Sequence, residues 1–135
     1  MNHHDDAVAT DAYASMLFGI AAFFNFAVAA ALLFLRSTFG PLVSLAPVAG
    51  TNLVFVYMVA FLIGTFGYAY ARIAQNPRRY RPFIELGAIG KLLAVAAVAE
   101  PWLAGEVGWQ LPLVVSGDLV FALLFIDFLR RTRPA

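Results

Sequence analysis

Four long apolar runs constrain this chain more than any other feature of its sequence. They cover residues 12–35, 52–74, 83–100 and 109–129, and each run holds few or no charged side chains. A helix needs about 20 mostly apolar residues to cross a bilayer. Charged residues make up only 13% of the chain, compared with about 25% in soluble domains. The runs therefore predict an all-α membrane protein with four transmembrane helices in one domain spanning residues 1–135.

The arginines predict how these helices are oriented. An even number of spans places both termini and the connection at residues 75–82 on one side of the membrane. That side would hold seven arginines, against Arg36 alone on the other: Arg72, Arg78, Arg79, Arg81, Arg130, Arg131 and Arg133. Because basic residues are enriched on the cytoplasmic side of membrane proteins, we expect an antiparallel four-helix bundle with both termini in the cytoplasm.

One lysine interrupts the third apolar run, and it needs a partner. An ammonium at the centre of a bilayer costs at least about 2.5 kcal/mol, so such groups face protein and pair with other polar groups. Counting helical rise, Lys91 lies about 12 Å from the cytoplasmic end of its helix, Asp118 about 16 Å and Asn25 about 18 Å. The third and fourth runs are joined by a short connection, which predicts neighbouring helices. We therefore expect Lys91 and Asp118 to form an intramembrane ion pair, with Asn25 as the nearest additional polar group.

Two explanations of this polar group remain open on the sequence alone. The pair can have a purely structural role, in which it selects which helices pack together and in what register. Alternatively, it can be a proton-responsive or ligand-anchoring site, because ionisable residues inside membranes are functional candidates. For Asn25, a hydrogen bond between helices is favoured over a catalytic role.

Small residues predict where the helices pack. Alanines and glycines at helical spacing let helix backbones approach closely in lipid. In the second run they form one stripe, and in the first run they share a face with Asn25. The second-run stripe consists of Ala60, Gly64, Gly67 and Ala71, and the first-run face of Phe18, Ala22, Asn25, Ala29, Leu32 and Arg36.

The ends of the helices follow from polar residues, glycine and proline. The polar residues 1–11 are expected to precede the first helix, with Asp11 as its cap. Prolines and glycines in residues 37–51 are expected to prevent regular helix there, and the apolar content of this segment predicts a position on the membrane surface. The third helix is expected to stop at Pro101. Two surface ion pairs at helical spacing are also predicted, Glu85 with Arg81 and Asp127 with Arg130 or Arg131.

Several kinds of chemistry have no support in the sequence. There is no cysteine for disulfide exchange or thiolate ligation, and both histidines, His3 and His4, lie in the polar tail. The net charge of +1 does not favour nucleic acid as a partner. We therefore predict no catalytic residues, no metal site and no cofactor. The basic connection between the second and third helices predicts contact with anionic lipid or an acidic partner through Arg78, Arg79 and Arg81.

Two stretches of the C-terminal half resemble a known group of proteins. They are NPRRYRPFIELGAIGKLL, residues 76–93, and SGDLVFALLFIDFLRR, residues 116–131. The hinge arginines, Lys91 and the Gly117–Asp118 pair are their most distinctive residues. The chain is similar to small, largely uncharacterised four-helix proteins of the bacterial inner membrane, broadly the DoxX-like proteins. The resemblance implies a four-helix bundle in the bacterial cytoplasmic membrane, and a link to quinones or membrane redox partners; it supplies no catalytic residues.

Three functions are consistent with these features. The leading interpretation is a non-enzymatic accessory or interaction subunit that binds a lipid or quinone between its helices, within a larger membrane complex or a homo-oligomer. The first alternative is a homo-oligomeric small transporter or channel that uses the Lys91–Asp118 pair. A further alternative is a quinone-linked, DoxX-like oxidoreductase subunit. An integral-membrane enzyme acting on a lipid ranks below these, because such an enzyme needs clustered histidines or acids near the interface.

Overall fold

The computed structural model describes residues 3–46 and 48–132, with side chains described from Thr10 onward. All the regular secondary structure in the described part is helical: α1 (His3–Phe34), α2 (Arg36–Leu42), α3 (Thr51–Gln75), α4 (Arg81–Leu103) and α5 (Gln110–Arg131). Four of the five helices are long and apolar enough to cross a membrane: α1 from Thr10 onward, α3, α4 and α5. The structure therefore has the four long apolar helices that the apolar runs predict.

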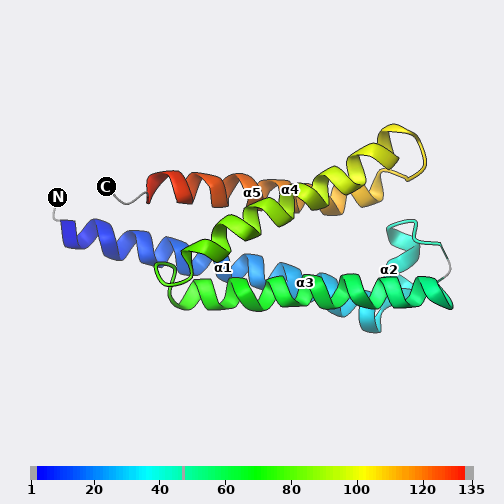
Figure 1. Cartoon of the computed structure of the whole chain (residues 1–135), viewed down its shortest axis with the longest axis horizontal. Coiled ribbons are helices and arrows are strands. Elements are labelled where there is room, and N and C mark those ends of the chain that lie inside the picture. Colours follow the sequence, from blue (N-terminus) through cyan, green and yellow to red (C-terminus); the bar gives the residue numbers. More distant parts are fainter. Residues whose placement is uncertain (1–2, 47, 133–135) are drawn as a thin grey trace.

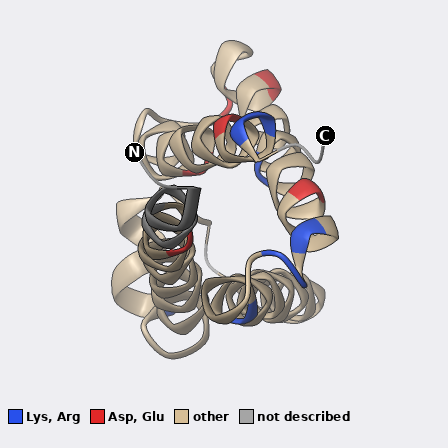
Figure 2. Ribbon diagram, turned by 90° about the vertical axis from the view of Figure 1, so that its left-hand side faces the viewer, with Lys and Arg blue, Asp and Glu red and all other residues tan. Residues whose placement is uncertain are grey.

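The helices form two pairs. α1 packs along α3 and α4 packs along α5, whereas α3 and α4 touch each other much less. Viewed end-on, the four long helices are arranged around a common centre (Figure 2). The start of α1, the α3–α4 connection and the end of α5 lie at one end of the molecule, and α2 and the α4–α5 connection lie at the other (Figure 1). We call the first the arginine end. We call the second the groove end, because α2 and the start of α5 line an apolar groove there.

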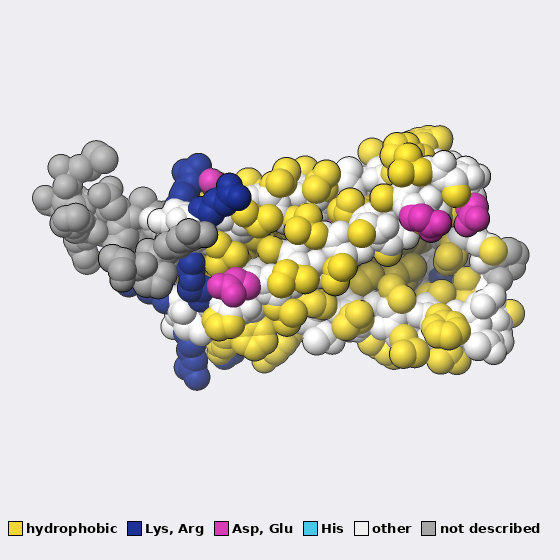
Figure 3. Space-filling model, turned by 45° about the horizontal axis from the view of Figure 1, so that its top comes forward, with side chains coloured by type: hydrophobic (Ala, Val, Ile, Leu, Met, Phe, Trp, Pro, Cys, Tyr) yellow, Lys and Arg dark blue, Asp and Glu magenta, His cyan; other side chains and the backbone are white. Residues whose placement is uncertain are grey.

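Charge distinguishes the arginine end. Arginine side chains gather there, while hydrophobic side chains cover most of the visible surface between the ends (Figure 3). Arg81 holds this end together, because its guanidinium donates hydrogen bonds to the Leu129 carbonyl at 2.9 Å and to Thr132 Oγ1 at 2.6 Å. Arg81 thus occupies acceptors at the C-terminus of α5, where orphan carbonyls need donors.

The small-residue stripe of α3 does pack against α1. A methyl group added at Gly67 would lie 3.2 Å from the Asn25 Cβ, and one at Gly64 would lie 3.7 Å from the Ala29 Cβ. Phe18, Ala22, Asn25 and Ala29 on the facing side of α1 are all buried. The stripe therefore acts as a close-packing surface between the two helices of the first pair.

Several predicted helix ends were wrong. α1 begins at His3, so Asp11 lies inside the helix and pairs with Arg78 at 3.4 Å instead of capping. α2 forms within the segment expected to be irregular, and it tolerates Pro41. α4 runs through Pro101 and ends at Leu103, and Gly105, two residues further on, has φ 77°. The Glu106 N–H donates to the Pro101 carbonyl and the Gly105 N–H to the Trp102 carbonyl, which is the Schellman arrangement that stops a helix.

The two predicted surface ion pairs have different outcomes. Asp127 pairs with Arg131 at 2.8 Å, as the spacing predicts. The expected pair between Glu85 and Arg81 is not among the ion pairs of the described side chains. Arg81 instead reaches α5, where a carbonyl at a helix end is a better-placed acceptor. The side chains of His3 and His4, and all of Arg133, lie outside the described part of the chain.

Candidate functional site

The structure brings Lys91, Asp118 and Asn25 together midway along the bundle. Lys91 Nζ lies 2.5 Å from Asp118 Oδ1 and donates a second hydrogen bond to Asn25 Oδ1 at 3.2 Å. The Asn25 side-chain amide donates to the Ile63 carbonyl at 3.1 Å. Together these bonds run from α3 through α1 and α4 to α5. We call Asn25, Lys91 and Asp118 the central polar group.

Small residues make room for the lysine on its own helix. Lys91 lies on the buried face of α4 with Ile84, Gly87 and Ala88. A methyl group added at Gly87 would lie only 2.7 Å from the Tyr70 ring. The glycine therefore lets Tyr70 of α3 approach α4, and the Tyr70 hydroxyl comes to 3.5 Å from the Gly87 carbonyl. The small residues Gly87 and Ala88 thus leave a narrow space that encloses the lysine side chain.

Aromatic rings surround the ammonium. Lys91 Nζ lies 5.5 Å from the centroid of Phe24, 5.3 Å from that of Tyr70 and 5.1 Å from that of Phe121. A cation within about 6 Å of an aromatic face is attracted by the ring quadrupole. These rings come from α1, α3 and α5, so the cation contacts every other long helix. The enclosure leaves Lys91 only 3% exposed.

The sequence does not predict that these three rings surround Lys91. Phe24 is next to Asn25, but counting rise along a helix gives the depth of a residue and not the direction in which it points. Gly117 is a partial sequence signal of a neighbouring bulky side chain. In the structure, a methyl group at this position would lie 3.1 Å from the Phe24 ring. The glycine before Asp118 therefore makes space for an aromatic side chain from α1.

The two partners of the ion pair differ in exposure. The Asp118 side chain is 19% exposed, whereas that of Lys91 is 3% exposed. Val114, one helical turn from Asp118 on α5, lines an apolar groove at the groove end. Ala122, one turn in the opposite direction, is fully buried. Asp118 is therefore the more exposed partner, and it lies on α5 between the groove-lining Val114 and the buried Ala122.

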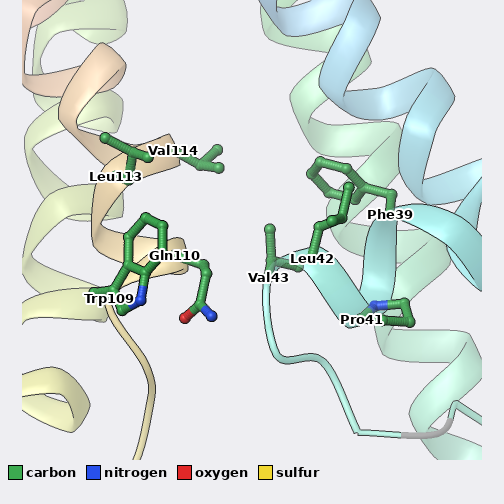
Figure 4. Close-up of a pocket in the computed structure, with 8 residues that line it drawn as sticks. All are labelled: Phe39, Pro41, Leu42, Val43, Trp109, Gln110, Leu113 and Val114. Carbon is green, nitrogen blue, oxygen red and sulfur yellow. The ribbon is translucent and has the colours of Figure 1, made fainter.

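An open apolar groove lies at the groove end of the described part of the chain. It has a volume of about 460 Å³, within the usual range of about 300–1,000 Å³ for ligand sites. α2 and the start of α5 form its two facing walls (Figure 4). Its lining is almost entirely apolar and consists of Phe39, Pro41, Leu42, Val43, Trp109, Gln110, Leu113 and Val114. A weak hydrogen bond from Ser44 Oγ to Gln110 Oε1, at 3.5 Å, joins the two sides of the groove.

The three arginines predicted to contact lipid or a partner have different neighbours in the structure. Arg78 is highly exposed and pairs with Asp11, Arg79 lies 5.6 Å from the Tyr80 ring centroid, and Arg81 is bonded to the end of α5. In the described part of the chain, no group of three histidines, cysteines or acids is arranged to hold a metal ion.

Comparison with known proteins does not assign the chain to a family. No family model matches it, and neither does any curated protein or solved structure. The relationship to DoxX-like proteins therefore stays a prediction.

Proposed function

We propose that this chain is a non-enzymatic accessory protein of the membrane that holds the apolar tail of a lipid or quinone between its two helix pairs. The groove at the groove end carries this proposal. It lies between α2, which connects the two helices of the first pair, and α5 of the second pair, and its walls offer apolar side chains with almost no polar group. An apolar tail would fill a space that the helices themselves leave open.

The central polar group suits a structural role more than a catalytic one. Its hydrogen bonds are made within the chain, and no buried side-chain nitrogen or oxygen in the described residues lacks a partner. A catalytic group needs a free nucleophile or base within reach of a substrate. Lys91 is enclosed and bonded, so it suits the joining of the helix pairs below the groove.

The proposal includes an orientation. In it, the chain crosses the bacterial inner membrane four times as an antiparallel bundle, with the arginine end and both termini in the cytoplasm. The gathering of arginines at one end supports this orientation. Reporter fusions after Ala135 test it: activity only of a cytoplasmic reporter is expected, and activity only of a periplasmic reporter would contradict it.

The two tryptophans provide a direct test of tail binding. Trp109 lines the groove, whereas Trp102 is exposed near the end of α4 and does not line it. In lipid nanodiscs, the Trp102→Phe variant reports on the groove and the Trp109→Phe variant reports on bulk membrane. A brominated isoprenoid or alkyl chain should quench Trp109 saturably and Trp102 only in proportion to its membrane concentration.

A groove-filling variant completes this test. Val114→Phe adds volume to the α5 wall, and it should abolish the saturable part of the Trp109 quenching while leaving the Trp102 signal unchanged. Equal, non-saturable quenching of both tryptophans in the unfilled protein would rule out a bound tail.

A small transporter is the second candidate, and the partial exposure of Asp118 favours it. A partly exposed carboxylate inside the bundle can accept a hydrogen bond from a transported molecule, and this candidate requires that the chain assembles as a homo-oligomer. Flux into proteoliposomes that disappears in Asp118→Asn, with the fold retained, would support transport over tail binding alone.

A further inference from the structure

The arginine end carries more positive charge than its acids neutralise. Among the described side chains, six arginines lie there against three acids: Arg72, Arg78, Arg79, Arg81, Arg130 and Arg131 against Asp11, Glu85 and Asp127. Two of the arginines are in ion pairs, Arg78 with Asp11 and Arg131 with Asp127. Arg81 is bonded to the end of α5. Arg72, Arg79 and Arg130 have no ion pair within the described part.

Two of these three arginines converge on one tyrosine. Arg72 Nη2 donates a hydrogen bond to the Tyr80 hydroxyl at 2.7 Å, and its Cζ lies 5.3 Å from the ring centroid. Arg79 Cζ lies 5.6 Å from the same centroid. The Arg72 hydrogen bond, with the charges of both arginines, lowers the pKa of Tyr80 from its ordinary value. The two distances place both guanidinium groups beside the Tyr80 ring.

Neutral contacts hold both arginines in place without cancelling their charge. Arg72 also donates to Gln75 Oε1 at 3.3 Å, and the Arg79 backbone N–H donates to Asn76 Oδ1 at 3.1 Å. The turn between α3 and α4 is therefore shaped so that both side chains reach Tyr80. Two positioned guanidinium groups with unused N–H donors match the oxygens of a phosphate group.

The surroundings of this cluster favour a lipid over a soluble anion. Tyr68, one turn before Arg72 on α3, is 60% exposed, and Phe83 at the start of α4 is 47% exposed. Both belong to helices that are apolar enough to cross the membrane. An exposed apolar surface therefore continues directly from the cluster along the helices, where acyl chains would lie.

We propose that Arg72 and Arg79, positioned by Tyr80, bind the phosphate of an anionic phospholipid in the leaflet at the arginine end. The net positive charge of this end selects a lipid with net negative charge over a zwitterionic one. This site replaces the predicted contact set, because Arg81 is engaged with α5 and Arg78 with Asp11. It is independent of the groove and of its proposed occupant.

A comparison of two double variants tests the site. Arg72→Gln/Arg79→Gln and Arg78→Gln/Arg130→Gln remove the same charge from the same end, but only the first removes the Tyr80 cluster. Phosphatidylglycerol and phosphatidylcholine are titrated into full-length protein in detergent, and bound lipid is counted by native mass spectrometry. The first variant should lose about tenfold more affinity for phosphatidylglycerol than the second, as the loss of a charge-assisted hydrogen bond would produce. Equal losses would overturn the proposal in favour of general attraction to anionic lipid.

Two further measurements keep the test decisive. Inorganic phosphate should not displace phosphatidylglycerol at matched concentration, and efficient displacement would overturn the assignment to a lipid. The second measurement needs no arginine variant: the alkaline titration of Tyr80 is isolated as the absorbance difference between the protein and its Tyr80→Phe variant. Phosphatidylglycerol should raise the pKa of Tyr80, because a bound phosphate offsets the positive charge that favours phenolate, whereas phosphatidylcholine should not. An unchanged titration in phosphatidylglycerol would also overturn the proposal.

Discussion

The two halves of the molecule, divided by the central polar group, differ in how they are packed. The arginine-end half contains all the largest fully buried side chains: Tyr70, Phe18, Phe125, Ile73 and Ile84. The groove-end half buries only smaller residues in the described part, such as Ala29, Val43 and Ala60. One half therefore closes on a core of aromatic and branched side chains, and the other leaves a groove between α2 and α5.

The contrast in packing shows which half determines how the helices fit together. On the arginine side, rings pack directly on one another, with Phe18 and Phe125 centroids 4.6 Å apart and Tyr70 and Phe125 centroids 5.2 Å apart. These contacts join α1, α3 and α5, so they fix the helix pairs relative to each other. On the groove side no equivalent cluster does so among the described residues. Helix packing can therefore be strict in one half while the other stays able to accept a ligand.

The largest loss of stability is expected when the Lys91–Asp118 pair, which lies between the two halves, is broken. Lys91→Met or Asp118→Leu alone leaves an uncompensated buried charge, which should lower the free energy of unfolding by about 3–5 kcal/mol. The double substitution removes both charges and should restore much of the loss. Unfolding in mixed micelles measures this, and equal damage from single and double variants would contradict a pair that acts as a unit. If the double variant also keeps its bound tail, the pair has a structural role alone.

The packed half should respond to truncation far more than the open half. Phe125→Ala removes a fully buried ring and should cost about 3–5 kcal/mol of unfolding free energy. Phe39→Ala removes a ring that lines the groove, and it should cost less than about 1 kcal/mol. The two variants are compared by the same unfolding measurement. Similar losses would mean that the halves are equally packed.

Alanine substitutions at two glycines compare how tightly each position is packed. Gly87→Ala places a methyl group 2.7 Å from the Tyr70 ring in the packed half, and this overpacking should cost about 1–3 kcal/mol. Gly64→Ala meets only ordinary contact, 3.7 Å from the Ala29 Cβ, and alanine favours helix over glycine by about 0.5–1 kcal/mol. Thermal unfolding should therefore show destabilisation at position 87 and little change or a gain at position 64. Destabilisation of the same size at both positions would contradict it.

The smallest effect is expected at the mouth of the groove. Gln110→Ala removes only the 3.5 Å contact with Ser44, so the free energy of unfolding should change by less than about 0.5 kcal/mol. A larger loss in thermal unfolding would show that this contact holds the walls of the groove together.

The helices and the depth of their polar residues could be predicted from the sequence, because both depend on distance along a chain. Apolar length defines the four spans, and helical rise places Lys91, Asp118 and Asn25 in one layer. The rings around Lys91 could not be predicted, since they depend on how α1, α3 and α5 are rotated about their axes. α2 was missed because its proline and glycine suggest a break. The expected pair between Glu85 and Arg81 was wrong because Arg81 bonds instead to the Leu129 carbonyl of α5, 48 residues away.

The division of the polar bonds between the helix pairs has a consequence for the biosynthesis of the chain. The bond from Asn25 to Ile63 lies within the first hairpin, α1 to α3, and the bond from Lys91 to Asp118 lies within the second, α4 to α5. Each hairpin can therefore enter the lipid with its costliest polar groups already paired. Only the hydrogen bond from Lys91 to Asn25 has to form when the hairpins meet. The chain is thus synthesised as two hairpins that can insert separately. When they meet, neither hairpin has to expose an unpaired charge to the acyl chains.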